Sequence, residues 1–323
     1  MRALVVTRFG EPDVLELRDL PDPAPGRGEV LVAVAAAGVN YIDVYQRRGV
    51  YPLEPPFVAG SEGAGTVVAV GDDVASPAVG DRVAWLMVPG AGYAERVVVP
   101  AERCVPVPDD IDDETAAAVM LQGITAEYLT HATHRVQAGD HVLVHAAAGG
   151  VGQLLTRACV ALGATVIGTV STAEKAAVAR AAGARHTVDY IREDVAETVA
   201  RLTDGRGVRV AYDGVGAPTQ QASLDSLGRR GTYVVFGQAG GAPAPVEAKT
   251  LSARGSLFFT RPTVVDHVVE REELLDRAGR VFGWLRDGTL SVAISARYPL
   301  ADAARAQADL EGRRTVGKLL VIP

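Results

Sequence analysis

The chain has 323 residues, of which 48% are hydrophobic, and its formal net charge is −7 at pH 7. That length allows two domains with separate cores, and the acidic balance argues against nucleic-acid binding, which needs a basic face. No stretch approaches the ~20 apolar residues of a membrane span, and the N-terminus lacks a signal-peptide layout, so we expect a cytoplasmic protein with no membrane partner.

The first third of the chain alternates short apolar runs with Gly, Pro and Asp up to about residue 110. Such spacing is typical of a small, barrel-like β domain. The clearest strand patterns are at 29–36, 65–70, 81–86 and 94–99. A helical pattern rich in Ala, Leu and Met then runs from Asp112 to His131.

Between residues 140 and 260, strand and helix patterns alternate regularly. The strand patterns lie at 141–146, 165–169, 186–189, 208–213, 231–236 and about 256–260, and the helical patterns at 151–162, 173–182, 193–203 and 218–227. Gly163, Gly183 and Gly205 stand where helices should end. Parallel βαβ units in this order predict a doubly wound α/β sheet with its ligand at the carboxyl ends of the strands.

The C-terminal segment is too short for a third domain and is expected to complete the first one. It contains a long amphipathic helical pattern at 265–286, a strand at 292–297, a helix at 301–311 and a last strand at 318–321. We therefore expect a nucleotide-binding domain at 124–260 and a catalytic domain formed by 1–123 and 261–323.

A glycine-rich turn joins the strand at 141–146 to the helical pattern that follows it. The turn, His145 to Gly152, reads HAAAGGVG, with Ala147 in place of the first glycine of the dinucleotide-binding motif. A helix that begins here leaves its first N–H groups free to bind a pyrophosphate. The residues expected to bind it are Ala148, Gly149, Gly150, Val151 and Gly152.

The type of nicotinamide cofactor is indicated about 20 residues beyond the turn, where an NAD site usually carries an acid. The strand there ends in Ser171 with no acid, and Lys175, Tyr190 and Arg192 follow on the same rim. A 2′-phosphate needs cations and hydroxyls, so the sequence favours NADPH. The alternative is that Ser171 and Glu174 form a capping box and Lys175 is a solvated helix residue.

Several motifs carry a resemblance to a known family. They are Gly38-Val39-Asn40-Tyr41-Ile42-Asp43-Val44-Tyr45, the turn at 145–152, Tyr212-Asp213-Gly214-Val215-Gly216 and Phe236-Gly237. With them the chain resembles, from end to end, the zinc-independent quinone oxidoreductases (zeta-crystallin-like enzymes) of the medium-chain dehydrogenase/reductase superfamily. Residues 255–262 and 298–300 resemble the bacterial quinone reductases in particular. The resemblance implies a GroES-like β-barrel catalytic domain and a Rossmann domain.

The resemblance also suggests that no metal takes part. Zinc alcohol dehydrogenases of this superfamily have a cysteine ligand where this chain has Asn40, and a histidine where it has Ser61. Tetrahedral zinc prefers thiolate or imidazole ligands, not an amide or a hydroxyl. The four-cysteine zinc lobe is missing, and His131 and His134 have no third ligand nearby, so we expect them to be packing or surface residues.

The family's substrate cleft is lined by residues that match Asn40, Asp43, Tyr45 and Tyr51. We expect Asn40 and Tyr51 to donate hydrogen bonds to a quinone oxygen and Tyr45 to shape the pocket. The alternative is barrel packing, because Tyr in a strand-and-turn region is usually an amphipathic core residue. For Asn40 the functional interpretation is favoured, because its amide has no obvious structural duty.

Further cofactor positions follow from the resemblance. They fall on Thr125, Ser171, Lys175, Tyr190, Phe236, Gly237, Phe258, Phe259, Thr260 and Lys318. Phe236 and Gly237 end a strand on the ligand side of the sheet, where the nicotinamide is expected. Lys318 matches a position near the cofactor or the cleft, and the alternative is that it begins the last strand as a solvated residue.

The resemblance therefore predicts an NADPH:quinone oxidoreductase that forms a homodimer through the edge strand at 255–260. Without a Lewis acid, such an enzyme suits acceptors that are already electrophilic, such as a quinone or an enone. Two alternatives remain open: an NADPH-dependent enoyl or alkenal double-bond reductase, and a non-catalytic NADPH-binding protein.

Overall fold

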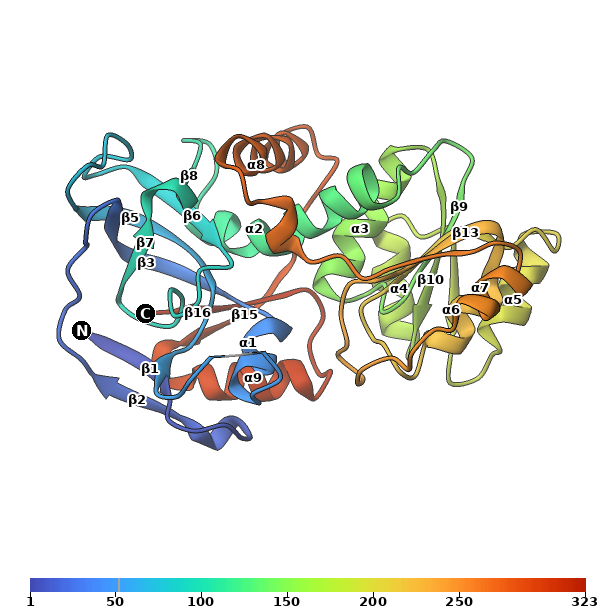
Figure 1. The fold of residues 1–323 in the computed structure, drawn as a ribbon, viewed down its shortest axis with the longest axis horizontal. Coiled ribbons are helices and arrows are strands. Elements are labelled where there is room, and N and C mark those ends of the chain that lie inside the picture. The colour runs from blue at the N-terminus through green and yellow to red at the C-terminus, as the bar shows by residue number, and fades with distance from the viewer. Residues whose placement is uncertain (52) are drawn as a thin grey trace. The chain divides into compact units, whose positions relative to one another are not determined.

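The computed structural model describes residues 1–51 and 53–323. These residues form two compact units (Figure 1). Unit 1 contains residues 1–124, 268–282 and 292–323, and unit 2 contains residues 125–267 and 283–291. The sequence predicts domain boundaries after residues 123 and 260. The structure instead assigns residue 124 to unit 1 and residues 261–267 and 283–291 to unit 2.

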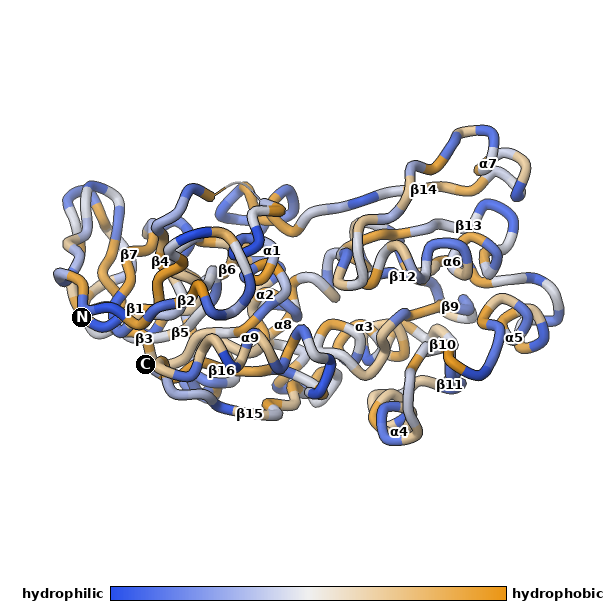
Figure 2. Tube along the Cα trace, turned by 90° about the horizontal axis from the view of Figure 1, so that it is seen from below, coloured by the Kyte–Doolittle hydropathy of each residue, from blue (hydrophilic) through white to orange (hydrophobic). Residues whose placement is uncertain are grey.

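Unit 2 is built on a six-stranded sheet in which every strand is parallel to its neighbours. The strands are β9 (His141–Val144), β10 (Thr165–Val170), β11 (His186–Asp189), β12 (Val208–Asp213), β13 (Leu227–Val235) and β14 (Phe258–Thr260), in the spatial order β11-β10-β9-β12-β13-β14. The central strands are largely apolar because helices cover them on both sides (Figure 2). This architecture confirms the predicted doubly wound sheet.

The helices of unit 2 lie between successive strands. They are α3 (Gly150–Ala161), α4 (Ala173–Ala181), α5 (Val195–Leu202), α6 (Gln220–Ser226) and α7 (Ala248–Ala253). Helices α3 and α4 contact each other on one side of the sheet, and α5 and α6 contact each other on the other side (Figure 1). Gly163, Gly183 and Gly205 follow the first three helices with positive φ, as the sequence predicts.

Unit 1 contains two β-sheets. The larger has the order β15-β16-β3-β5-β6-β8 with β7 also paired to β3, and the smaller has the order β2-β1-β4. The strands are β1 (Arg2–Val6), β2 (Leu15–Asp19), β3 (Glu29–Val39), β4 (Phe57–Val58), β5 (Glu62–Val70), β6 (Arg82–Leu86), β7 (Arg96–Pro100), β8 (Val105–Pro106), β15 (Ile294–Pro299) and β16 (Lys318–Ile322). Only β15 and β16, among the pairs of these described strands, run parallel.

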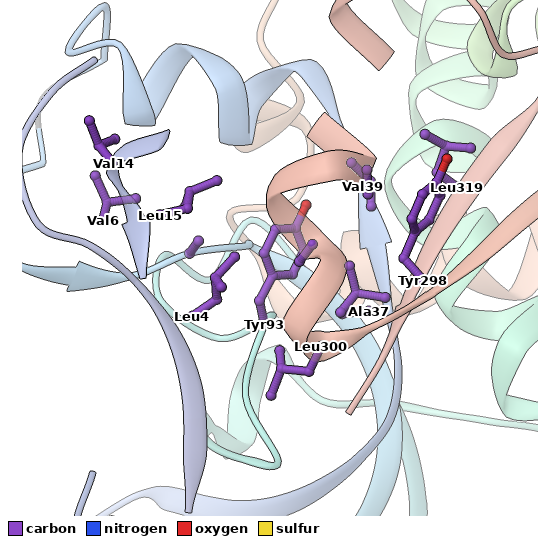
Figure 3. Packing of buried hydrophobic residues seen from close by; sticks show 14 residues of the cluster. Leu4, Val6, Val14, Leu15, Ala37, Val39, Tyr93, Tyr298, Leu300 and Leu319 are labelled. Carbon is purple, nitrogen blue, oxygen red and sulfur yellow. The ribbon is translucent and has the colours of Figure 1, made fainter. Parts of the chain in front are cut away.

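One hydrophobic core of unit 1 joins the first strands to the C-terminal segment. Leu4 and Val6 of β1, Tyr93, and Leu300 pack together with α9 (Ala303–Glu311) over them (Figure 3). Burial of such a cluster is the main force that brings chain segments this distant in sequence together. The last 32 residues, Val292–Pro323, accordingly belong to unit 1, with the β domain.

Two predicted elements differ from the structure. Residues 41–47, expected in a strand-and-turn region, form helix α1 (Tyr41–Arg47). The long helix expected at 265–286 is instead a short 3₁₀ turn, Val264–His267, followed by α8 (Arg271–Arg286). Helix α2 (Asp113–Tyr128) continues into a π-helical turn, Leu129–Thr133. Within residues 1–51 and 53–323, no helix has both the length and the apolar character needed to cross a membrane.

Candidate functional site

The turn from β9 to α3 lies at the carboxyl edge of the sheet in unit 2, where the strand order reverses. Gly149 is the N-cap of α3. A Cβ atom on Gly152 would lie 2.3 Å from the carbonyl oxygen of Ala146, so only glycine allows α3 to pack this closely on the turn. Because the first N–H groups of a helix have no partner within it, this turn can bind an anion.

Ser171, Lys175 and Tyr190 gather on the same edge, beyond the ends of β10 and β11. The Lys175 ammonium donates to the Ser171 hydroxyl at 3.5 Å, and the backbone N–H of Tyr190 donates to the last carbonyl of β10 at 3.2 Å. Thr172 caps α4, because its hydroxyl accepts from the N–H of Lys175 at 3.2 Å. The alternative of a capping box between Ser171 and Glu174 is therefore wrong.

Phe236 and Gly237 follow β13 on this edge and pack against the loop that follows β12. A Cβ atom on Gly214 would lie 2.9 Å from the Phe236 ring, and one on Gly237 would lie 2.8 Å from the Gly214 carbonyl oxygen. The N–H of Phe236 donates to the carbonyl of Asp213 at 2.9 Å. The two loops are thus in direct contact at the place where the sequence puts the nicotinamide.

A buried polar network lies beneath this edge. His145 contacts the hydroxyl of Thr169 at 3.1 Å and the hydroxyl of Ser223 at 2.9 Å. The Asp213 carboxylate accepts the hydroxyl of Tyr233 at 2.9 Å and that of Ser223 at 3.4 Å. Burial lowers the pKa of His145. These side chains tie β9, β10, β12 and β13 together immediately below the loops.

Asp213 also fixes the conformation of the loop that follows β12. Its Oδ1 atom accepts the N–H groups of Val215 and Gly216 at 2.8 and 3.0 Å and the hydroxyl of Thr219 at 2.8 Å. A carboxylate that accepts several N–H groups holds a tight turn in one conformation. The network therefore orders the loop from below.

The remaining predicted cofactor residues lie in separate places. Phe258, Phe259 and Thr260 form β14, the edge strand of the sheet. Thr125 is buried in α2, whereas Arg192 is 84% exposed with its nearest carboxylate oxygen at 3.7 Å. Lys318 belongs to unit 1.

In unit 1, strand pairing brings together a buried cluster of Asn40, Glu62 and Lys318. The Lys318 ammonium donates to Glu62 Oε2 at 2.6 Å and to Asn40 Oδ1 at 2.9 Å. The Asn40 amide donates to Glu62 Oε2 at 2.7 Å and to the Gly38 carbonyl at 3.3 Å. The other Glu62 oxygen accepts the N–H of Leu121 at 2.5 Å. The side chains of Glu62 and Lys318 are both fully buried.

This cluster corrects two expectations. Lys318 does begin the last strand, but it is not solvated, because its exposed fraction is 0%. The Asn40 amide does have a structural duty, because both its oxygen and its nitrogen are hydrogen bonded within unit 1. Lysine can only donate and a carboxylate accepts, so these partners also fix which way the amide faces. A Cβ atom on Gly38 would lie 2.1 Å from Glu62 Oε2, so glycine makes room for the cluster.

Asp43 links the cluster to the first turn of α1. Its Oδ2 atom accepts the N–H of Asn40 and the hydroxyl of Tyr93, both at 2.9 Å. Its Oδ1 atom is buried and has no hydrogen-bond partner among the described residues. Burial raises the pKa of Asp43 to about 7, against the lowering effect of its two hydrogen bonds. Asp43 therefore holds the start of α1 and titrates near neutral pH.

Tyr45 and Tyr51 lie together on the half-buried surface of unit 1. Their rings stack with centroids 5.7 Å apart, and Tyr41 is 6.1 Å from Tyr45. The N–H of Tyr51 donates to the carbonyl of Tyr45 at 3.4 Å. Since Tyr45 is on a helix, strand packing does not explain its position. The structure thus places Asn40 and Asp43 at the start of α1, and the stacked rings of Tyr45 and Tyr51 on the helix and beyond its end.

The side chains around Asn40 do not fit a zinc ion. Ser61 donates to Gln46 at 3.2 Å, and the charge of Glu62 is already paired with Lys318. Within residues 1–51 and 53–323, no group of three or more His, Cys, Asp or Glu side chains is placed to hold a metal ion. Amide and hydroxyl groups are poor zinc ligands, so the donor set argues against zinc here.

Several of these residues are not predicted by the sequence pattern. Glu62 is not among the predicted site residues, although a charged residue at the start of an apolar strand is a signal of a buried pair. Lys318 is one of three lysines and also opens an apolar strand, which is the matching signal. The roles of Thr169 and Ser223 have no such signal, because isolated hydroxyl residues occur throughout the chain.

Comparison with known families gives a consistent result for both units. Residues 26–109 match the alcohol dehydrogenase GroES-like domain, and residues 150–277 match the family described as zinc-binding dehydrogenase. That description names zinc, whereas the amide and hydroxyl groups around Asn40 are poor zinc ligands.

Several relatives and solved structures are similar to this chain over nearly its full length. The chain is 46% identical to a quinone oxidoreductase of Pseudomonas aeruginosa, covering 98% of this chain and 97% of that protein. It is 41% identical to a 2-haloacrylate reductase of a Burkholderia species, covering 99% and 98%. A mycobacterial protein solved in complex with NADPH is 47% identical and covers 100% of both chains with a TM-score of 0.97.

Proposed function

The chain belongs to the quinone oxidoreductase family of the medium-chain dehydrogenase/reductase superfamily, and from that premise we propose that it is an NADPH:quinone oxidoreductase. When bound, NADPH supplies the hydride. The observation that carries the proposal is the full-length similarity to a quinone oxidoreductase at 46% identity. The β9–α3 turn, Ser171 and Lys175 at the carboxyl edge of unit 2 are compatible with NADPH as the cofactor.

In this proposal the carboxyl edge of unit 2 holds the cofactor. The N-terminus of α3 binds the pyrophosphate, and Gly152 lets α3 pack closely on the turn before it. Lys175 and the hydroxyls of Ser171 and Tyr190 bind the 2′-phosphate, because a cation and hydroxyls match a phosphate better than a ribose hydroxyl. A relative solved with NADPH supports this choice.

Unit 1 supplies the groups that position the acceptor. A quinone is already electrophilic, so its reduction needs a hydrogen-bond donor at the developing oxyanion but no metal. We assign the Tyr51 hydroxyl as that donor and the stacked Tyr45 ring as the wall that orients the acceptor. Because the Asn40 amide is bonded to Glu62 and Lys318, its part is to hold the start of α1 in place.

A substrate panel tests the proposal. We expect the purified protein to oxidise NADPH with benzoquinones and naphthoquinones, and Tyr51→Phe to lower kcat about tenfold. Tyr41→Phe is a matched control, because it removes a hydroxyl from the other ring beside Tyr45, and that hydroxyl donates to the Leu310 carbonyl. Wild-type turnover in both Tyr51→Phe and Asn40→Ala would contradict these assignments.

The similarity to a 2-haloacrylate reductase supports a second candidate, reduction of an activated carbon–carbon double bond. The same panel should therefore include 2-haloacrylates, enones and enoyl thioesters. Turnover of these compounds without turnover of quinones would make this candidate the function. Binding of NADPH with no turnover of any acceptor would identify a non-catalytic NADPH-binding protein.

We further propose that two copies pair through β14. This strand ends the sheet order, and Phe258 and Phe259 are 56% and 38% exposed. An exposed apolar edge strand suits continuation of a sheet across a two-fold axis. Light scattering should give a dimer for the wild type and a monomer for Phe259→Arg, and a monomeric wild type would contradict the proposal.

A further inference from the structure

A cavity of about 580 Å³ lies in unit 2 at the amino ends of β9, β12 and β13. Its lining includes His141, Arg209 and Leu227, which stand at or next to the starts of these strands. The glycine turn and the rim around Ser171 lie at the carboxyl ends of the same sheet. The cavity is therefore separate from the proposed cofactor site, because the two lie at opposite ends of the strands.

An irregular segment of β13 forms one wall of this cavity. Val208 of β12 pairs with Leu227, but Val210 pairs with Thr232, so residues 228–231 are not matched one to one by β12. Arg230 in this bulge has a φ of +58°, in the left-handed region that non-glycine residues seldom adopt. Bulges of this kind redirect side chains, and strained backbone often accompanies functional sites. Here the bulge presents Arg229 to the cavity.

The lining carries more positive than negative charge, in a protein whose net charge is −7. Its charged side chains are Arg206, Arg209, Arg229, Arg254, Asp140 and Asp225, which gives four guanidinium groups against two carboxylates.

These charges are only partly compensated by one another. Asp225 forms an ion pair with Arg254, and Asp204 lies 3.4 Å from Arg206. The Arg209 guanidinium lies 4.0 Å from the nearest Asp140 oxygen and donates to the Arg229 carbonyl at 3.1 Å. The Arg229 guanidinium has no hydrogen-bond or ion-pair partner within the described part of the chain. The Arg229 guanidinium thus remains available in the cavity to bind an anion.

Ser226 adds a second, independent observation. It lines the cavity and is 2% exposed, and its buried hydroxyl has no hydrogen-bond partner among the described residues. Buried hydroxyls are normally hydrogen bonded, and an unpartnered one calls for an explanation such as a missing ligand. A hydroxyl donor beside guanidinium groups is a typical combination for an oxyanion.

We propose that this cavity binds a small phosphomonoester, with Arg229 and Arg209 on the phosphate and the Ser226 hydroxyl donating to one of its oxygens. The planar guanidinium group matches the geometry of phosphate oxygens better than other cations do. The volume falls in the range of small-molecule sites, which leaves room for an organic part beyond the phosphate.

The test is calorimetric titration of the full-length protein at fixed ionic strength, with NADPH present in excess so that phosphate cannot enter the cofactor site. The two probes are inorganic phosphate and glycerol 3-phosphate. We expect saturable binding, weakened about tenfold or more in Arg229→Gln and about threefold in Ser226→Ala. Arg230→Gln is the matched control, because this neighbouring arginine is absent from the lining and its loss changes the net charge equally.

Comparing the two probes distinguishes an organic phosphate from free phosphate as the ligand. Tighter binding of glycerol 3-phosphate would assign an organic phosphate as the ligand, whereas tighter binding of inorganic phosphate would correct this to the free ion at the same site. No saturable binding, or equal weakening in Arg229→Gln and Arg230→Gln, would overturn the site. Ser226→Ala keeps the test decisive if Arg229→Gln does not fold.

Discussion

The carboxyl edge of unit 2 and the Asn40 cluster of unit 1 are stabilised in different ways. At the carboxyl edge of unit 2, glycines and a network around His145 and Asp213 hold loops in contact with one another. In unit 1, a fully buried ion pair between Lys318 and Glu62 holds the amide of Asn40. The first region depends on close backbone packing, and the second depends on charge compensation. Substitutions at the carboxyl edge of unit 2 should therefore change mainly the affinity for NADPH. Substitutions in the Asn40 cluster should change mainly the free energy of unfolding.

The largest effect is expected from the ion pair. Lys318→Met leaves the Glu62 carboxylate buried without its cation, which should lower the free energy of unfolding by about 3–5 kcal/mol. Urea unfolding measures this change. The double variant Lys318→Met/Glu62→Gln should recover a large part of it, because no uncompensated charge remains. Lys249→Met is the control, since the ion pair of Lys249 with Glu247 is exposed and should contribute less than about 1 kcal/mol.

The second effect concerns Asp43, whose pKa burial raises to about 7. A carboxyl group with a higher pKa in the folded than in the unfolded state binds its proton more tightly when folded. Its contribution to stability should therefore be largest near pH 4 and decrease as pH rises to about 7. Asp43→Asn should remove this decrease, which we expect to be on the order of 2–4 kcal/mol.

Unfolding by urea between pH 4 and pH 8 measures the slope for both proteins. Asp309→Asn is the control, because hydrogen bonds from Tyr298 and Arg314 lower the pKa of Asp309 and confine its effect to more acidic conditions. An identical pH dependence in the wild type and in Asp43→Asn would show that Asp43 does not titrate in this range.

The third effect concerns backbone packing at the carboxyl edge. Gly152→Ala places a methyl group 2.3 Å from the Ala146 carbonyl oxygen, so the turn must shift and NADPH should bind about tenfold more weakly. Fluorescence titration measures the affinity. Gly279→Ala in α8 is the control, because a Cβ atom there meets nothing within 4 Å, and it should raise stability by roughly 0.5–1 kcal/mol. Equal NADPH affinity in wild type and Gly152→Ala would contradict the assigned role of the turn.

Much of unit 2 was predictable from the sequence, because the periodicity of apolar residues and the glycines that end helices are local signals. The strands at 186–189 and 208–213 and the helix-ending glycines follow the predicted positions. Helix α1 was not predictable in the same way, because its seven residues are too few to show a clear period. Its helical form depends on Asp43 accepting the N–H of Asn40 and the hydroxyl of Tyr93.

The pairing of Lys318 with Glu62 could not be predicted from local pattern. The two residues are 256 positions apart, and only the pairing of β16 with β3 and of β3 with β5 brings them together. Site residues that depend on such long-range pairing need either a structure or a family resemblance. The glycine turn, by contrast, carries its signal within eight residues.

We propose that this chain reduces quinones with NADPH and without a metal. The most direct measurement is kcat/KM for a naphthoquinone, with NADPH and with NADH, before and after dialysis against EDTA. We predict strong preference for NADPH, reduced in Lys175→Ala, and no loss of activity after dialysis. Equal efficiency with NADH, or activity that disappears with EDTA and returns with zinc, would contradict the account.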